Sequence, residues 1–189
     1  TLLMLAGLAR AGEVFIEAET FKASGGWSII DGVAGKTASG LAMLGGAGGA
    51  KDGIATTTVN IKDAGHYHLW VRYSSHPKWR GPFHVTALAG DRVLGDALFD
   101  MEFAGDRTKP EDVWKSFEID LPEGEVTLKL SKHDNLNAGG AARQIDCLLL
   151  TMNDKLVPNH LHFGAQTYVR VTLGDGYEKP AYIHIFADH

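Results

Sequence analysis

Two glutamates near the start of the chain have the clearest potential for chemistry. Glu17 and Glu19 stand two positions apart in the run VFIEAE, residues 14–19, which is a predicted strand. Residues i and i+2 of a strand point to the same face, so both carboxylates would project together. Like charges at close range repel unless something compensates them, and a cation is the simplest compensator. Either the pair binds a cation such as Ca²⁺, which prefers oxygen ligands, or both glutamates are solvated on an exposed strand face.

Nine histidines raise a second possibility, a transition-metal site. His66 and His68 share one face of a predicted strand, and such a pair can bind Zn²⁺. Other pairs are His160 with His162 and His184 with His189. Because no third histidine or acid accompanies them at a recognisable spacing, solvated histidines are the favoured interpretation. No Gly-x-Ser-x-Gly motif is present, and no carboxylate pair stands out as a glycosidase pair.

The elements that must position these side chains are short β-strands. Alternating apolar and polar residues mark the run HYHLWVRY at 66–73, with Tyr67, Leu69, Val71 and Tyr73 on one face and His66, His68, Trp70 and Arg72 on the other. Further strands are predicted at 14–19, 56–61, 83–88, 92–98, 114–119, 125–130 and 145–152, separated by turn residues. The glycine-rich stretch 40–53 is interpreted as a flexible edge or loop, since it lacks the ending of a phosphate loop. Roughly eight strands predict an all-β fold, an antiparallel β-sandwich or jelly roll.

The chain divides into three predicted regions. Residues 1–12 begin with an apolar run followed by Ala9-Arg10-Ala11, which matches the pattern before a signal-peptidase cut. This region is interpreted as a signal-peptide remnant or an N-terminal extension. Residues 13–153 form the sandwich. Residues 154–189 contain extra β strands at 167–173 and 181–186, so they are a linker plus the start of a second β region, or C-terminal strands that pack on the sandwich. Export implies a secreted, periplasmic or cell-surface protein.

Composition excludes some partners. A net charge of −5 and a pI near 5.9 argue against nucleic acid. No stretch is long and apolar enough for membrane insertion. The single cysteine, Cys147, lies in an apolar run and is predicted to be a small buried hydrophobic residue.

Six short motifs resemble a known family in their order. They are Glu-Ala-Glu (17–19), Gly-Trp (26–27), Tyr-x-Leu-Trp-Val-Arg-Tyr (67–73), Trp-x-x-Phe (114–117), Leu-Pro-x-Gly-x-x-Thr-Leu-x-Leu (121–130) and Gln-Ile-Asp-x-Leu-x-Leu (144–150). Over residues 13–153 the chain is similar to carbohydrate-binding modules of families six and thirty-five, which are jelly-roll domains of secreted glycan-active enzymes. The resemblance implies a structural calcium ion held by Glu17, Glu19 and Asp146.

The resemblance also implies a sugar-binding site in the loops at one end of the sandwich. Aromatic rings would stack on a pyranose there, and polar groups would bond its hydroxyls. The candidate ligand-binding residues are Trp79, Trp114, Asn135, Asn137 and Arg72. For Trp79 loop packing is an equal alternative, whereas for Trp114, and also for Trp27 and Trp70, packing is the favoured role.

Three functions follow from different classes. The first is a non-catalytic, calcium-stabilised module that binds a polysaccharide or oligosaccharide and belongs to a larger secreted glycan-active protein. The second is a structural or adhesive β-sandwich subunit of a cell-surface assembly. The third is a metal-dependent enzyme. The sequence favours the first, in which the chain itself is not an enzyme.

Overall fold

The computed structural model describes residues 12–31, 37–46, 53–76, 81–101, 110–133, 143–158, 167–171 and 181–185. The chain separates into two compact units, residues 9–157 and residues 1–8 with 158–189. In the second unit, β12 (Thr167–Val171) and β13 (Ala181–Ile185) pair antiparallel, which confirms both predicted C-terminal strands. Their assignment to a second β region stays a prediction. No helix in the described ranges is long and apolar enough to cross a membrane.

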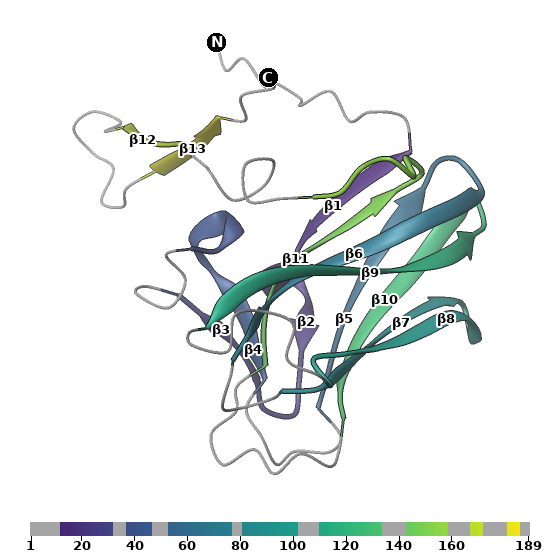
Figure 1. Cartoon of the computed structure of the whole chain (residues 1–189), viewed down its shortest axis with the longest axis horizontal. Coiled ribbons are helices and arrows are strands. Elements are labelled where there is room, and N and C mark those ends of the chain that lie inside the picture. The colour runs from purple at the N-terminus through teal and green to yellow at the C-terminus, as the bar shows by residue number, and fades with distance from the viewer. Residues whose placement is uncertain are drawn as a thin grey trace. The chain divides into compact units, whose positions relative to one another are not determined.

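The first unit consists of two antiparallel sheets (Figure 1). The six-stranded sheet has the order β3 (Trp27–Ile30), β4 (Met43–Gly46), β11 (Arg143–Thr151), β6 (Gly65–Ser75) and β9 (Glu111–Leu121), and β1 (Glu13–Glu17) also pairs with β11. The five-stranded sheet has the order β2 (Lys22–Ala23), β5 (Ile54–Ile61), β10 (Gly124–Lys132), β7 (Phe83–Ala89) and β8 (Arg92–Phe99). Two short 3-10 helices, η1 (Ala18–Thr20) and η2 (Ser39–Leu41), are also described. The predicted antiparallel β-sandwich is confirmed, and its eight predicted strands correspond to β1 and β5 to β11.

Alternation along the strands builds the core between the two sheets. The predicted inner face of β6 is buried, with Tyr67, Leu69, Val71 and Tyr73 at most 3% exposed. The facing sheet contributes Val85 and Ala87 from β7 and Val126, Leu128 and Leu130 from β10. Burial of this apolar surface is the main stabilising term of the fold.

Aromatic rings close the core near the end of β6. The Tyr73 ring meets the Phe83 ring edge-on, with 5.5 Å between centroids, and Phe83 stacks on Phe99 at 5.4 Å. Such contacts stabilise a core beyond the area they bury. They fix the spacing of the two sheets beside the loops that follow β6 and β8.

The interpretation of 40–53 as a flexible edge or loop is wrong for residues 43–46, which form β4. This strand lies between β3 and β11, and all four of its residues are buried. Its glycines allow close approach: an added Cβ would lie 2.1 Å from Ile30 Cδ1 at Gly45 and 2.7 Å from Trp27 Cζ3 at Gly46. Glycine in a strand interior often marks such a close contact. Trp27 is 7% exposed, which confirms its predicted core position.

Replacing Gly46 by alanine is expected to lower the free energy of unfolding by about 1–3 kcal/mol, the usual cost of overpacking. The new methyl group would press on the Trp27 ring, which the core holds in place. Gly65→Ala is the control, because its Cβ would meet the terminal methyl of the exposed Met152 side chain, which can rotate away. Urea denaturation of both variants measures the difference. Equal losses for the two would contradict the packing role of Gly46.

Candidate cation and ligand site

A change of backbone direction after β1 positions the two glutamates. Glu17 is the last residue of the strand and lies across from Cys147 of β11. The chain then enters η1, where the Thr20 hydroxyl donates to the Glu17 carbonyl at 2.6 Å. Glu19 therefore belongs to a 3-10 turn. The predicted strand over 14–19 is too long, and strand alternation is not what brings Glu19 beside Glu17.

An irregularity in β11 turns Asp146 away from the core. The pairing of β11 with β6 shifts register between Ile145 and Cys147. The core residues on either side are Ile145 and Leu148, an odd and an even position, so the regular alternation is broken there. A bulge of this kind re-aims side chains and bends the strand. As a result Asp146 and Cys147 lie on the outer face of the six-stranded sheet, away from the core, although both are buried there next to the end of β1.

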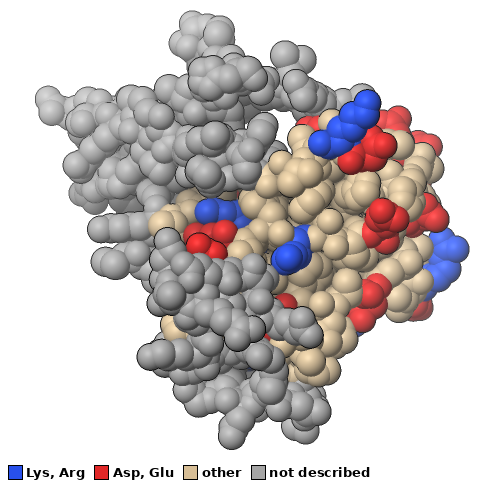
Figure 2. Space-filling view, viewed as in Figure 1, with Lys and Arg blue, Asp and Glu red and all other residues tan. Residues whose placement is uncertain are grey.

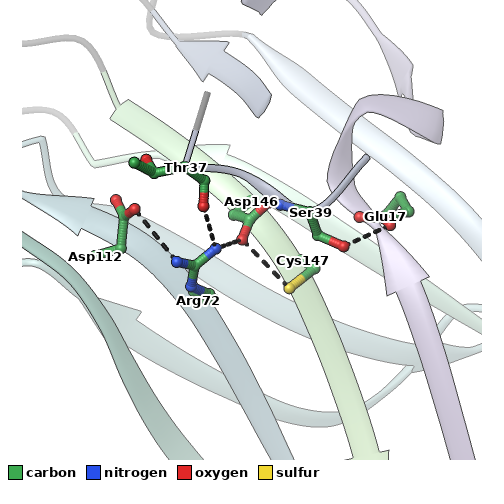
Figure 3. A network of polar contacts seen from close by, with 7 residues as sticks. All are labelled: Glu17, Thr37, Ser39, Arg72, Asp112, Asp146 and Cys147. Carbon is green, nitrogen blue, oxygen red and sulfur yellow. Dashed lines mark hydrogen bonds and ion pairs between the residues drawn. The ribbon is translucent and has the colours of Figure 1, made fainter. Parts of the chain in front are cut away.

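The turn containing η2 joins Glu17 to Asp146. Ser39 donates its backbone N–H to Asp146 Oδ1 at 2.8 Å and its hydroxyl to Glu17 Oε1 at 2.7 Å (Figure 3). Gly40 has a φ of +64°, a conformation that favours glycine. An added Cβ at Gly40 would lie 2.6 Å from Glu19 Oε1 and 3.5 Å from Glu17 Oε1. The glycine thus makes room for the two carboxylates.

Burial makes this cluster electrostatically unusual. Burial, together with the negative charge of Glu19, raises the pKa of Glu17 to about 7, against the effect of the Ser39 hydrogen bond. Burial also raises the pKa of Glu19 to about 7. The Oε2 atoms of Glu17 and Glu19 are buried and accept no hydrogen bond from the described residues. Buried polar atoms normally have a partner, so these two oxygens need one.

Arg72 of β6 compensates the most buried acid of the cluster. Its guanidinium donates to Asp146 Oδ2, to the Thr37 carbonyl at 3.0 Å and to Asp112 Oδ2 at 3.3 Å (Figure 3). Asp146 is fully buried and Arg72 is 5% exposed. Burial raises the pKa of Asp146 to about 6, although Arg72 opposes that increase. The guanidinium positions Asp146, and the predicted ligand contact of Arg72 stays a prediction.

The predicted sugar-binding residues fall partly within the described structure. Trp114 of β9 lies across from Arg72, and Trp70 of β6 lies across from Ser116, so the two tryptophans are diagonal neighbours on the outer face of the six-stranded sheet. Both are half-buried, and Trp70 does not belong to the core cluster. Trp79, Asn135 and Asn137 lie outside the described residues. Figure 2 shows acidic and basic groups interspersed over the described part of this face.

Arg143 and Asp100, which the sequence did not single out, connect the ends of several strands. Arg143, which is 4% exposed, donates to the carbonyls of Pro82 at 2.6 Å and His133 at 2.9 Å. Asp100, also buried, accepts from the Ser75 hydroxyl at 3.0 Å and from the Gly81 backbone N–H at 2.7 Å. These hydrogen-bond partners lie between 10 and 61 positions away along the chain, so no local sequence pattern predicts the roles of Arg143 and Asp100.

Within the described part of the chain, the two histidines of β6 form no metal centre with acids. His66 is exposed, and its two nitrogens face Asp120 at 2.8 Å and Glu118 at 3.5 Å. Its ring centroid is 6.1 Å from that of His68. Among the described residues, no three His, Cys, Asp or Glu side chains converge to hold a metal ion. Both oxygens of Asp146 already accept hydrogen bonds, so the predicted calcium set of Glu17, Glu19 and Asp146 is gathered in one region without forming a closed cage.

Comparison with known proteins places this fold. No protein-family model and no curated protein matches the sequence. Among solved structures, the isomalto-dextranase of Arthrobacter globiformis T6, complexed with panose, matches 76% of this chain with a TM-score of 0.56 and 19% identity. This chain covers 24% of that enzyme.

Isolated modules match over nearly their whole length. The C-terminal family 6 carbohydrate-binding module of a marine laminarinase from Zobellia galactanivorans is one of them. The match spans 98% of that module and 74% of this chain, with a TM-score of 0.52 and 15% identity. A family 35 carbohydrate-binding module from Clostridium thermocellum is another. The match spans 98% of that module and 74% of this chain, with a TM-score of 0.52 and 16% identity. The first unit of this chain therefore has the jelly-roll fold of carbohydrate-binding modules, as the sequence motifs indicated.

Proposed function

We propose that the chain is a non-catalytic carbohydrate-binding module of a larger secreted glycan-active protein. The observation that carries the proposal is the match of the sandwich to isolated carbohydrate-binding modules over 98% of their length. Folds host unrelated functions, so the site must supply the rest of the argument.

Aromatic residues beside polar groups support glycan binding. Trp114 and Trp70 share one face of the six-stranded sheet. Asp112 and Arg72 lie beside them, close to the end of β6 and the start of β9. An indole offers an apolar platform to the flat side of a pyranose, and carboxylate and guanidinium groups can bond its hydroxyls. The predicted loop residues Trp79, Asn135 and Asn137 would extend this site.

Calorimetry against a panel of neutral and acidic polysaccharides tests the function. We expect at least one glycan to bind, and we expect Trp114→Ala and Trp79→Ala each to weaken that binding at least tenfold by removing a stacking platform. Lys115→Ala, an exposed neighbour of Trp114, is the control and should bind normally. If no glycan binds to the folded chain, the module has a structural or adhesive role instead.

We also propose that Glu17 and Glu19 hold a structural Ca²⁺. Their buried Oε2 atoms have no donor among the described residues, and the absence of a side chain at Gly40 lets both carboxylates approach the same turn. Ca²⁺ takes about 6–8 oxygen ligands, and backbone carbonyls and waters commonly complete its shell. Asp146 would contribute through a lone pair that Ser39 and Arg72 leave free, since an ionised carboxylate offers about four acceptor sites. The ion would tie the end of β1 to β11 and to the η2 turn.

The calcium proposal predicts a pH-dependent effect of chelation. In calcium-free protein, burial raises the pKa of Glu17 and Glu19 to about 7, above the value of 4.5 for a free glutamate. The folded state then binds these protons more tightly than the unfolded chain, so the contribution of these two groups to stability is greatest in acid and is lost as the pH rises through about 7. Ca²⁺ binds the deprotonated carboxylates, so we expect it to raise the melting temperature more at about pH 8 than at about pH 5.

Thermal melts in EDTA and in Ca²⁺ measure this difference. Glu19→Gln should remove most of the calcium response, and Glu125→Gln, a change at an exposed glutamate of β10, should preserve it. A melting temperature that chelation leaves unchanged at both pH values would refute the calcium site.

A further inference from the structure

A group of two histidines and an aspartate lies on the five-stranded sheet, where β7 runs between β10 and β8 (Figure 1). His84 is on β7, and His133 follows the last residue of β10. The Nε2 atom of His84 lies 3.2 Å from Nδ1 of His133. On its other side, Nδ1 of His84 lies 2.8 Å from Asp96 Oδ2 on β8. The contacts thus run from the carboxylate of Asp96 to the imidazole of His84 and on to that of His133.

The backbone and a neighbouring hydroxyl hold this group in place. The His133 N–H donates to the Pro82 carbonyl at 3.0 Å, and the His133 carbonyl accepts from Arg143 at 2.9 Å. Asp96 is fixed by the Thr86 hydroxyl, which donates to Oδ1 at 2.6 Å. Pre-organised ligands lose little entropy when they bind. The His84 side chain is 30% exposed, so an ion can reach the pair from solvent.

The carboxylate sets the tautomer of His84. Although burial opposes the effect, the hydrogen bonds from Thr86 and His84 lower the pKa of Asp96. Asp96 is therefore ionised at neutral pH and accepts from Nδ1–H of His84, which leaves Nε2 with its lone pair when the ring is neutral. A carboxylate behind a histidine in this way is the usual second partner of a metal-ligating imidazole.

We propose that His84 Nε2 and His133 Nδ1 bind a divalent transition-metal ion such as Zn²⁺, with Asp96 orienting His84. Zinc–nitrogen distances of about 2.0–2.1 Å in a tetrahedral site separate two nitrogens by roughly 3.3–3.4 Å. The observed separation of 3.2 Å is close to this value, so binding requires a change of ring tilt with little movement of the backbone. The metal replaces the proton that the two rings share, and water fills its remaining positions. This site is separate from the glutamate cluster and does not depend on the proposed carbohydrate function.

Zinc calorimetry on the full chain without an affinity tag, in calcium-containing buffer, tests the site. We expect stoichiometric binding by the wild type, and we expect His84→Gln and His133→Gln each to weaken it at least tenfold. Asp96→Asn should weaken it ten- to a hundredfold, the usual effect of losing a carboxylate behind a ligating histidine. His66→Gln is the matched control, because His66 also faces an acid but has no second imidazole within hydrogen-bond distance in the described structure, and it should bind zinc normally.

Imidazole ¹⁵N spectra provide a readout that folding defects do not imitate. Zinc should shift Nε2 of His84 and Nδ1 of His133 while leaving the His66 nitrogens in place. Calcium, which prefers oxygen ligands, should shift neither. Absence of zinc binding at submillimolar concentrations, or zinc binding that survives unchanged in folded His84→Gln and His133→Gln proteins, would overturn the proposal.

Discussion

Replacing Arg72 by methionine is expected to lower the free energy of unfolding by about 3–5 kcal/mol at neutral pH, because it leaves a buried charge without its partner. Asp146 is fully buried and its Oδ2 accepts from the guanidinium, while Ser39 N–H and the weakly donating Cys147 thiol are neutral donors. The substitution also removes the donors to Asp112 and to the carbonyl of Thr37. Methionine retains most of the aliphatic volume of arginine. The decrease in the free energy of unfolding therefore measures the loss of the positive charge and not the effect of a cavity.

Urea denaturation in EDTA measures this loss without interference from bound calcium. Burial already raises the pKa of Asp146 to about 6 with Arg72 present, so without Arg72 the carboxyl should protonate more readily. The deficit should therefore shrink as the pH falls to about 5. Arg72→Met with Asp146→Asn should recover part of the loss, and Arg92→Met, at an exposed arginine, should cost little. A deficit independent of pH would argue against an ionised Asp146.

Replacing Arg143 by methionine is expected to lower the free energy of unfolding by about 2–4 kcal/mol, since buried carbonyls lose charged donors. The guanidinium connects the carbonyls of Pro82 and His133, which flank β7 and β10. Its side chain also packs under Gly81, whose added Cβ would lie 2.9 Å from Arg143 Cγ. The loss should therefore loosen the start of β7 and the end of β10, which Arg143 connects.

Two measurements separate this role from simple destabilisation. Arg143→Met should weaken glycan binding even where the protein is fully folded, because the candidate loop residues Trp79 and Asn137 are carried by the segments that Arg143 anchors at their ends. Arg143→Lys keeps the charge but presents a point donor in place of the planar fork, so it should lose an intermediate amount of stability. Normal glycan affinity in a folded Arg143→Met protein would show that the anchor does not shape the ligand site.

The sequence anticipated the sandwich because the relevant information is local. In β6 and β10 a buried residue alternates with a polar one, and this period of two is visible without knowing the partner strands. The pattern fails at β4, where Gly45 and Gly46 carry no side chains to alternate. It also fails around Asp146, where a bulge shifts the core from Ile145 to Leu148.

The acidic cluster was predicted in part. Glu17, Glu19 and Asp146 were named from motif order, and the structure gathers them beside Ser39 and Gly40. The interaction of Arg72 with Asp146 was missed, because the two residues are 74 positions apart and meet only through the pairing of β6 with β11.

The sequence by itself determined the eight longer strands of the sandwich, which faces of them are apolar, and that the chain resembles a carbohydrate-binding module, because strand alternation and motif order are properties of neighbouring residues; β2, β3 and β4 were not predicted. Only the tertiary structure decided which side chains share a site. Strand order brings Arg72 to Asp146 and His84 to His133, and a turn instead of a strand carries Glu19. Contacts between distant residues depend on how the sheets are assembled, and no local pattern encodes them.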